Sequence, residues 1–191
     1  MSLVIITVDR ENRTHTIFSD GIEVSNDYMD VISQQKNKTR KLECCGHSVL
    51  FGFCGDSNIG RYMSNHIGEY LEEFRIFEKM NSHVDEVEEL FIRMFQKVYD
   101  TYKEDMRHEE DDITFQCVLS IDGQLFRIEK SDEPEIDSKV INDSDFTCIG
   151  IGSDIASALI ENNVAMNNIF NTIHKHKTCI GSEMFILSDN F

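Results

Sequence analysis

The stretch from Ser19 to Gly55 decides the fold. It opens on Ser19-Asp20-Gly21, closes on Phe51-Gly52-Phe53-Cys54-Gly55, and carries a basic cluster in between: Lys36, Lys38, Arg40 and Lys41. One short span therefore holds a carboxylate, several cations and a glycine-interrupted apolar strand, directly after an apolar amino-terminal run. This stretch is the first candidate for a functional site, and the rest of the chain is interpreted as its support.

Length and composition predict one globular domain over residues 1–191. The chain has 40% hydrophobic and 28% charged residues, and 191 residues are enough to bury a sizeable core. A single proline and ten glycines leave little material for a flexible linker. We therefore expect no internal domain boundary.

The formal net charge of −17 at pH 7 argues against polyanionic partners. A nucleic-acid partner normally requires a basic face that releases counterions from the phosphates. No run approaches the roughly 20 apolar residues of a membrane span, and no basic region precedes a secretory apolar core. We therefore expect neither nucleic acid nor membrane as a partner, and a cytoplasmic location.

The six cysteines lie mostly inside apolar runs, where a reduced thiol behaves as a small buried hydrophobic residue. One local cluster, Cys44-Cys45-Gly46-His47, has metal-binding residue types. Adjacent strand residues point to opposite faces, so Cys44 and Cys45 are not expected to share an ion. Aromatic and methionine residues in the predicted helices are interpreted as core faces. We therefore expect neither a metal nor a cofactor.

Hydrophobic periodicity predicts strands, two helices, strands, two helices and a final strand. Apolar runs predict strands over residues 3–8, 14–19, 41–45, 48–54, 113–120, 124–129, 146–150 and 184–187. Hairpin turns are predicted at Gly46-His47 and Asp122-Gly123. Residues 22–32 are interpreted as short strand plus loop, and the charged segments 103–112 and 131–137 as loops.

Four amphipathic helices are predicted over residues 59–74, 84–99, 155–160 and 166–173. Their expected amino-terminal caps are Asp56 or Ser57, then Ser82 in a capping box with Asp85, then Ser153 and Asn163. Helices with one apolar face need a sheet beneath them, and a first strand that is apolar on both faces needs cover on both sides. The predicted architecture is an α+β fold, a four-layer αββα sandwich.

Four short motifs follow one another in a recognisable order: Asp20-Gly21, Lys38-Thr39-Arg40-Lys41-Leu42, Val49-Leu50-Phe51-Gly52-Phe53-Cys54-Gly55 and Ile149-Gly150-Ile151-Gly152-Ser153. Together with the first strand and the helix pair, they resemble the proteasome β-subunit and its bacterial relative HslV over nearly the whole chain. The resemblance implies an amino-terminal-nucleophile hydrolase. In that family the first residue of the mature chain, a threonine, attacks a peptide carbonyl, and its α-amino group acts as base.

The resemblance assigns roles to four residues. Asp20 matches the carboxylate beside the nucleophile, and Lys38 matches the buried ammonium that lowers the local proton affinity. Gly52 matches the glycine whose N–H stabilises the oxyanion, and Ser153 matches the serine after the last core strand. Each position also has a simpler explanation: a turn aspartate, a solvated lysine, a packing glycine and a helix cap.

The nucleophile departs from the family pattern, because the chain begins Met1-Ser2-Leu3-Val4 without a threonine. Removal of Met1 would place Ser2 at the amino terminus, where serine can serve as nucleophile. One hypothesis is therefore a peptidase with the catalytic residues Ser2, Asp20, Lys38, Gly52 and Ser153. The alternative is a non-catalytic proteasome-like structural or interaction protein. The resemblance also implies a homo-oligomeric ring, a peptide or unfolded-protein substrate and an ATPase partner.

Overall fold

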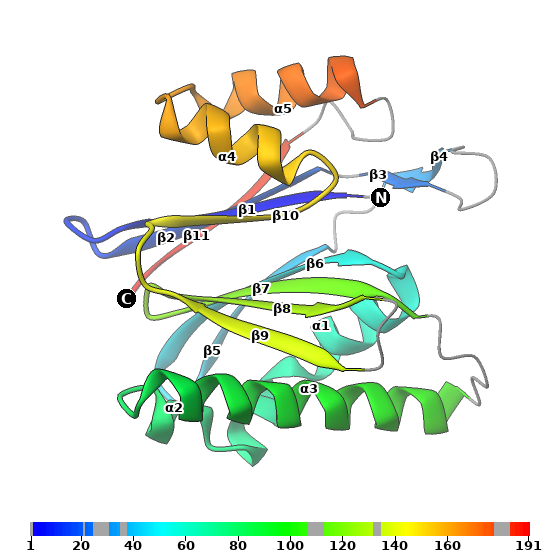
Figure 1. Cartoon of the computed structure of the whole chain (residues 1–191), viewed down its shortest axis with the longest axis vertical. Helices are drawn as coiled ribbons and strands as arrows, with labels where there is room; N and C mark the ends of the chain where they lie inside the picture. The colour runs from blue at the N-terminus through cyan, green and yellow to red at the C-terminus, as the bar shows by residue number, and fades with distance from the viewer. Residues whose placement is uncertain are drawn as a thin grey trace.

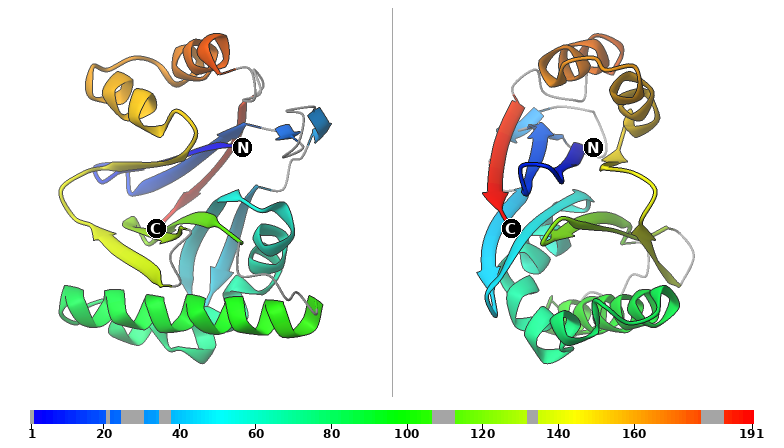
Figure 2. Two further views of the ribbon diagram at one scale, coloured as in Figure 1. Left: turned by 45° about the vertical axis from the view of Figure 1, so that its right-hand side comes forward. Right: turned by 90° about the vertical axis from the view of Figure 1, so that its left-hand side faces the viewer.

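The structure is a computed structural model that describes residues 2–20, 22–24, 31–34, 38–106, 113–131, 135–177 and 184–191. Four layers stack in the order helices, sheet, sheet, helices (Figure 1). Two antiparallel sheets form the middle of the stack, and the views in Figure 2 separate them from the helical layers on either side. This arrangement is the αββα sandwich that the sequence predicts.

The first sheet has the strand order β10-β1-β2-β11, and every neighbouring pair is antiparallel. Its strands are β1 (Leu3–Asp9), β2 (Thr14–Asp20), β10 (Phe146–Gly150) and β11 (Met184–Asn190). The second sheet has the order β5-β6-β7-β8-β9, with strands β5 (Thr39–Cys44), β6 (His47–Gly55), β7 (Phe115–Ile121), β8 (Gln124–Lys130) and β9 (Ile136–Ile141). A separate pair is formed by β3 (Ile22–Val24) and β4 (Val31–Gln34).

Strand β1 explains why the sheets stack, because its side chains alternate between two apolar layers. Leu3 and Ile5 belong to the core cluster that includes residues of α4 (Ser153–Glu161) and α5 (Met166–His176). Val4 and Ile6 belong to the cluster between the two sheets. All four side chains are fully buried, and each such burial is worth about 1.5–3 kcal/mol. The continuous apolar run therefore has cover on both faces, as predicted.

The second helical layer covers the outer face of the β5–β9 sheet. It consists of α1 (Ser57–Glu73), the short α2 (Ile76–Lys79) and α3 (Val84–Met106). Phe91 and Phe95 of α3 lie against Phe126 and Phe115 of the sheet, with ring centroids 4.5 and 6.4 Å apart. None of the described helices is both long enough and apolar enough to span a membrane.

Two predicted turns have different outcomes. The β7–β8 hairpin turns at Asp122-Gly123, whose φ angles of 46° and 79° are those of the predicted two-residue turn. The β5–β6 hairpin turns at Cys45-Gly46 and not at Gly46-His47, because Cys44 and His47 are the last paired residues. Cys45 therefore leaves the strand and adopts a φ of 53°.

The charged segments contain more regular structure than predicted. Helix α3 continues to Met106 through the first part of the predicted loop 103–112, of which residues 107–112 lie outside the described part of the chain. The predicted loop 131–137 ends in the unpredicted strand β9, whose buried Ile136, Ser138 and Val140 alternate with exposed polar residues. Charge content misleads in both places because each element has only one buried face.

Three of the four predicted helix caps are wrong. Asp56 caps α1 as expected, since its Oδ1 accepts from the N–H groups of Asn58 and Ile59 at 2.8 and 3.1 Å. Helix α3 begins at Val84, one residue later than a cap at Ser82 implies. Ser153 is the first residue of α4, after Gly152, and the residue before α5 is Ala165 and not Asn163.

Candidate active site

Asp20 lies at the end of β2 with a fully buried side chain. Its Oδ1 accepts a hydrogen bond of 2.9 Å from the backbone N–H of Leu3, the first residue of β1. Because β1 and β2 form a hairpin in which Val4 is opposite Ser19, the end of β2 and the start of β1 meet. The carboxylate is thus held directly beside Ser2.

Lys38 brings a positive charge to the same point. Its Nζ lies 3.2 and 3.3 Å from the two carboxylate oxygens of Asp20, and the residue is only 4% exposed. The N–H of Phe53 donates to the Lys38 carbonyl at 3.1 Å, which extends the β5–β6 pairing to this residue. Lysine and aspartate are almost never fully buried unless paired, so the solvated-lysine explanation is wrong for Lys38.

Ser2 is also buried, with 6% of its surface exposed. Its carbonyl accepts a hydrogen bond of 2.9 Å from the N–H of Ile151, just after β10. Gly150 allows this close approach, because a Cβ at its position would lie 1.9 Å from the Ser2 oxygen, and its φ of 89° also favours glycine. Ser2 is thereby fixed between the β2 end and the β10 end.

Gly52 lies in β6, opposite Thr39 of β5 and Val118 of β7. A Cβ at this position would lie 2.7 Å from both Val4 Cγ1 and Ile17 Cδ1 between the sheets. Successive N–H groups of a strand point to opposite edges, and the next N–H, that of Phe53, donates to Lys38 on the β5 side. The Gly52 N–H is therefore directed toward β7. Packing accounts for the glycine, whereas an oxyanion role stays a prediction.

Ser153 is not joined to this cluster by any hydrogen bond found among the described residues. The segment before it makes the contact instead, through the Ile151 N–H to Ser2. The Gln116 side chain supports that segment, since its Oε1 accepts from the Gly150 N–H at 2.8 Å. Sequence reasoning missed Gln116, because a glutamine in an apolar strand carries no local signal of its partner.

Cys54 is a further group beside the candidate site that the sequence did not assign to it. Its Sγ is 3.7 Å from the carbonyl oxygen of Ile149, which pairs with Val4 of β1. Burial, followed by the negative charge of Asp20, raises the pKa of this thiol to about 12. A raised pKa favours the protonated thiol near neutrality, which is the less nucleophilic form of cysteine.

The structure corrects the geometric argument against a metal at Cys44-Cys45. That argument assumed that both residues lie in one strand, but Cys45 lies in the turn. The two sulfur atoms and a carboxylate oxygen of Glu72 all lie within 4.8 Å of one another. This cluster is at the far end of β5 from Lys38, about 20 Å away at 3.3 Å per residue.

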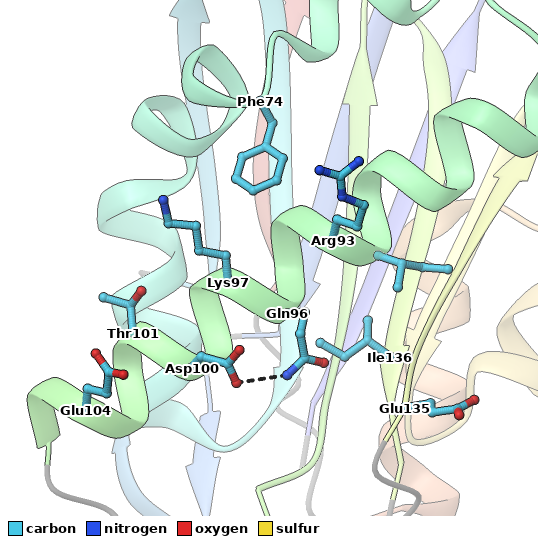
Figure 3. Close-up of a pocket in the computed structure, with 10 residues that line it drawn as sticks. Phe74, Arg93, Gln96, Lys97, Asp100, Thr101, Glu104, Glu135 and Ile136 are labelled. Atoms are coloured by element: carbon cyan, nitrogen blue, oxygen red, sulfur yellow. Dashed lines mark hydrogen bonds between the residues drawn. The ribbon is translucent and has the colours of Figure 1, made fainter.

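A groove of about 740 Å³ lies elsewhere, along α3 in the outer helical layer. Figure 3 shows Arg93, Lys97 and Asp100 of α3 around it, with Phe74 from the end of α1 and Ile136 from β9. A smaller polar cleft of about 280 Å³ is lined by Thr39, next to Lys38, and by residues of α1. Neither cavity is lined by Ser2, Asp20 or Lys38.

No protein-family model matches the chain, and no curated protein matches its sequence. Solved structures do match. Eukaryotic HslV from Trypanosoma brucei has a TM-score of 0.63 at 12% identity, covering 98% of this chain and 99% of that one. The Anbu (Gly-1) mutant from Hyphomicrobium sp. strain MC1 has a TM-score of 0.61 at 14% identity, covering 100% and 82%. Anbu (ancestral beta-subunit) from Yersinia bercovieri has a TM-score of 0.63 at 10% identity, covering 98% and 81%.

These superpositions cover nearly the whole chain, whereas the identities are low. The likeness is therefore one of fold, and it agrees with the layer order and strand pairing described above. The chain has the fold of HslV and Anbu, which confirms the predicted resemblance at the level of the fold.

Proposed function

We propose that the chain is a proteasome-like peptidase subunit that hydrolyses peptide bonds with Ser2 as amino-terminal nucleophile. The observation that carries the proposal is the buried Lys38–Asp20 ion pair, in which Asp20 also accepts the N–H of the residue after Ser2. A buried ion pair is a weak stabiliser, because desolvation of the two charges offsets much of their attraction. Its place beside Ser2 is better explained by chemistry than by stability.

The proposed reaction needs Ser2 to carry a free α-amino group. That amine has an ordinary pKa of about 8, so it can take the proton of the Ser2 hydroxyl near neutrality. The oxygen then attacks the peptide carbonyl, and the α-ammonium gives its proton to the departing amine as the C–N bond breaks and the acyl-ester forms. Water then hydrolyses the ester, which releases the carboxylic acid product and restores the Ser2 hydroxyl. The Lys38 ammonium, held by Asp20, would stabilise the developing negative charge on the Ser2 oxygen.

The proposal extends to assembly, location and partners. By resemblance to HslV and the proteasome β-subunit, copies of the chain would form a ring in the cytoplasm. That ring would receive peptides or unfolded protein from an ATPase. Ser153 and Gly52 stay in the proposed site only as expectations from the resemblance, Ser153 through its segment beside Ser2.

A second candidate function is a non-catalytic subunit that keeps the fold. Gly52 favours it, because its N–H is directed along the sheet toward β7, whereas an oxyanion donor has to point at the reacting carbonyl. Such a protein would retain the Asp20–Lys38 pair as an inherited feature and act through its surfaces.

The experiment begins with intact mass and amino-terminal sequencing of native protein, followed by hydrolysis of a fluorogenic peptide panel. The peptidase is expected to start at Ser2, and its turnover should be lost in Ser2→Ala. The matched control Ser188→Ala removes an exposed hydroxyl from β11 and should keep full turnover. Retained residues before Ser2 together with no turnover on any peptide would exclude the peptidase and favour the non-catalytic subunit.

A second set of variants tests the ion pair. Lys38→Met with Asp20→Asn removes both charges, and the introduced asparagine still offers an oxygen to the Leu3 N–H. If this folded double variant turned over peptide at the parent rate, the charge pair would have no part in catalysis. We expect at least a hundredfold loss, which corresponds to about 2.7 kcal/mol of transition-state stabilisation.

A further inference from the structure

A cluster of metal-binding groups lies where the β5–β6 turn meets the last turn of α1. Cys44 ends β5, Cys45 begins the turn, and Glu72 is the next-to-last residue of α1. The Cys44 thiol lies 3.4 Å from Glu72 Oε1 and 3.5 Å from the Gly68 carbonyl oxygen. With Cys45 included, one ligand atom from each of the three side chains falls within 4.8 Å of the others.

The Cys44–Glu72 separation is that of two ligands around one tetrahedral zinc ion, and the separations that involve Cys45 are at most 4.8 Å. Bond lengths of about 2.3 Å to sulfur and about 2.0 Å to oxygen place a sulfur and an oxygen about 3.5 Å apart, and two sulfurs about 3.8 Å apart. The Cys44 sulfur and Glu72 Oε1 are 3.4 Å apart, close to this sulfur–oxygen separation. The backbone at Cys45 allows the two sulfur atoms to approach each other. In a regular strand the Cys45 side chain would point to the face opposite Cys44, but the φ of 53° at Cys45 turns it away from that face.

We propose that Cys44, Cys45 and Glu72 bind a zinc ion. Two thiolates and one carboxylate suit zinc and disfavour magnesium and calcium, which take oxygen ligands. Water would fill the fourth position, since Cys45 and Glu72 are exposed at this surface. The ion would fasten the β5–β6 hairpin to the carboxyl end of α1.

The surroundings of the three groups are compatible with a cation. Glu72 forms no salt bridge with a lysine or arginine among the described residues, so no side-chain cation occupies its oxygen. The Cys44 thiol donates its proton toward that oxygen, and zinc would replace this proton. Because zinc binds the thiolate form of cysteine, binding releases this proton to solvent.

The test titrates fully reduced, metal-free protein with Co²⁺ and then with Zn²⁺ in competition. We expect one metal per chain, thiolate-to-cobalt charge-transfer absorption, and X-ray absorption from the zinc complex with two sulfur neighbours at about 2.3 Å. Cys45→Ser and Glu72→Gln should each weaken zinc binding at least about tenfold, as loss of even a supporting group does.

Matched variants separate the site from general thiol and charge effects. Cys179→Ser removes a cysteine distant in the sequence, and Glu69→Gln makes the same charge change in α1 at an exposed glutamate. Both should bind zinc as the parent does, with thermal unfolding confirming that every variant is folded. No stoichiometric complex, or equal affinity in Cys45→Ser, Glu72→Gln and the parent, would overturn the proposal.

Discussion

Gly52 is the residue at which packing and chemistry give competing accounts. Replacing it with alanine puts a methyl group 2.7 Å from Val4 and Ile17 between the sheets. We expect Gly52→Ala to lower the free energy of unfolding by about 1–3 kcal/mol, because a well-packed core resists extra volume. Urea denaturation measures this loss.

A second glycine provides the contrast. Gly68 lies inside α1, and its added Cβ would meet only the end of the half-buried Leu42 side chain, at 3.1 Å. Gly68→Ala should leave stability unchanged or raise it by up to about 1 kcal/mol through helix propensity. Equal losses in the two variants would show that packing between the sheets is not what requires Gly52.

The Asp20–Lys38 pair predicts strong coupling between two substitutions. Lys38→Met alone leaves a buried carboxylate without its cation and should cost about 3–5 kcal/mol. Adding Asp20→Asn removes the orphaned charge, so the double variant should recover much of that loss. Denaturation of all four proteins gives the coupling energy, and simple additivity would mean that the two charges do not interact.

His15 predicts a pH dependence of stability. The imidazole is buried, and its nitrogens lie 2.7 Å from the hydroxyls of Ser120 and Ser48. Burial lowers the His15 pKa from 6.5. The negative charges of Asp189 and Asp122 raise this pKa in part, and the positive charge of Lys41 lowers it slightly. The folded state therefore binds fewer protons than the unfolded state below pH 6.5.

The free energy of unfolding should consequently fall as pH drops from 6.5 toward the lowered pKa, by at most about 1.4 kcal/mol per pH unit. Urea denaturation of the parent and of His15→Gln across pH 5–7 isolates this contribution. The parent should lose more stability than the variant over that range. Parallel pH profiles would contradict the assignment.

Helix α1 depends on its amino-terminal cap. Asp56 Oδ1 accepts from two backbone N–H groups at the start of the helix. We expect Asp56→Ala to cost about 1 kcal/mol and Asp56→Asn much less, because asparagine caps nearly as well. Hydrogen exchange should become faster in the first turn of α1 in the alanine variant. Similar losses in both variants would point to the charge and not to the cap.

Elements with regular periodicity could be predicted from the sequence, whereas their ends could not. The run 3–8 predicts a doubly covered strand, and β1 is one. By contrast, β9 buries only alternate residues within an acidic segment, so charge content concealed it. The caps predicted at Ser153 and Asn163 were wrong, because a residue type that suits a cap does not fix the residue at which the backbone becomes helical.

The candidate site was predictable to the same limited degree. The resemblance predicted that Asp20 and Lys38 belong to one site. Their contact depends on the β1–β2 and β5–β6 hairpins, whose register is fixed by the apolar pattern. It did not indicate which residue after β10 approaches Ser2, because that depends on the pairing of Leu3 with Gly150. The rule that neighbouring strand residues point to opposite faces did not hold for Cys45, because the turn begins at Cys45, one residue earlier than predicted.

The charge of the whole molecule constrains the proposed ring. Each copy carries a formal net charge of −17, so neighbouring copies repel one another. Salt screens this repulsion, with a Debye length of about 30 Å at 0.01 M and about 8 Å at 0.15 M. Assembly should therefore weaken as ionic strength falls, because the repulsion then acts across the whole interface.

Sedimentation velocity at these two ionic strengths measures the effect. We expect a ring-sized species at 0.15 M salt and a shift toward single chains at 0.01 M. If the ring stayed assembled at 0.01 M salt, the carboxylates at the interface would be paired with cations, or the interface would contain no carboxylates. A single chain at every ionic strength would contradict the proposed ring, while leaving the Ser2 chemistry to be decided by the variants of that site.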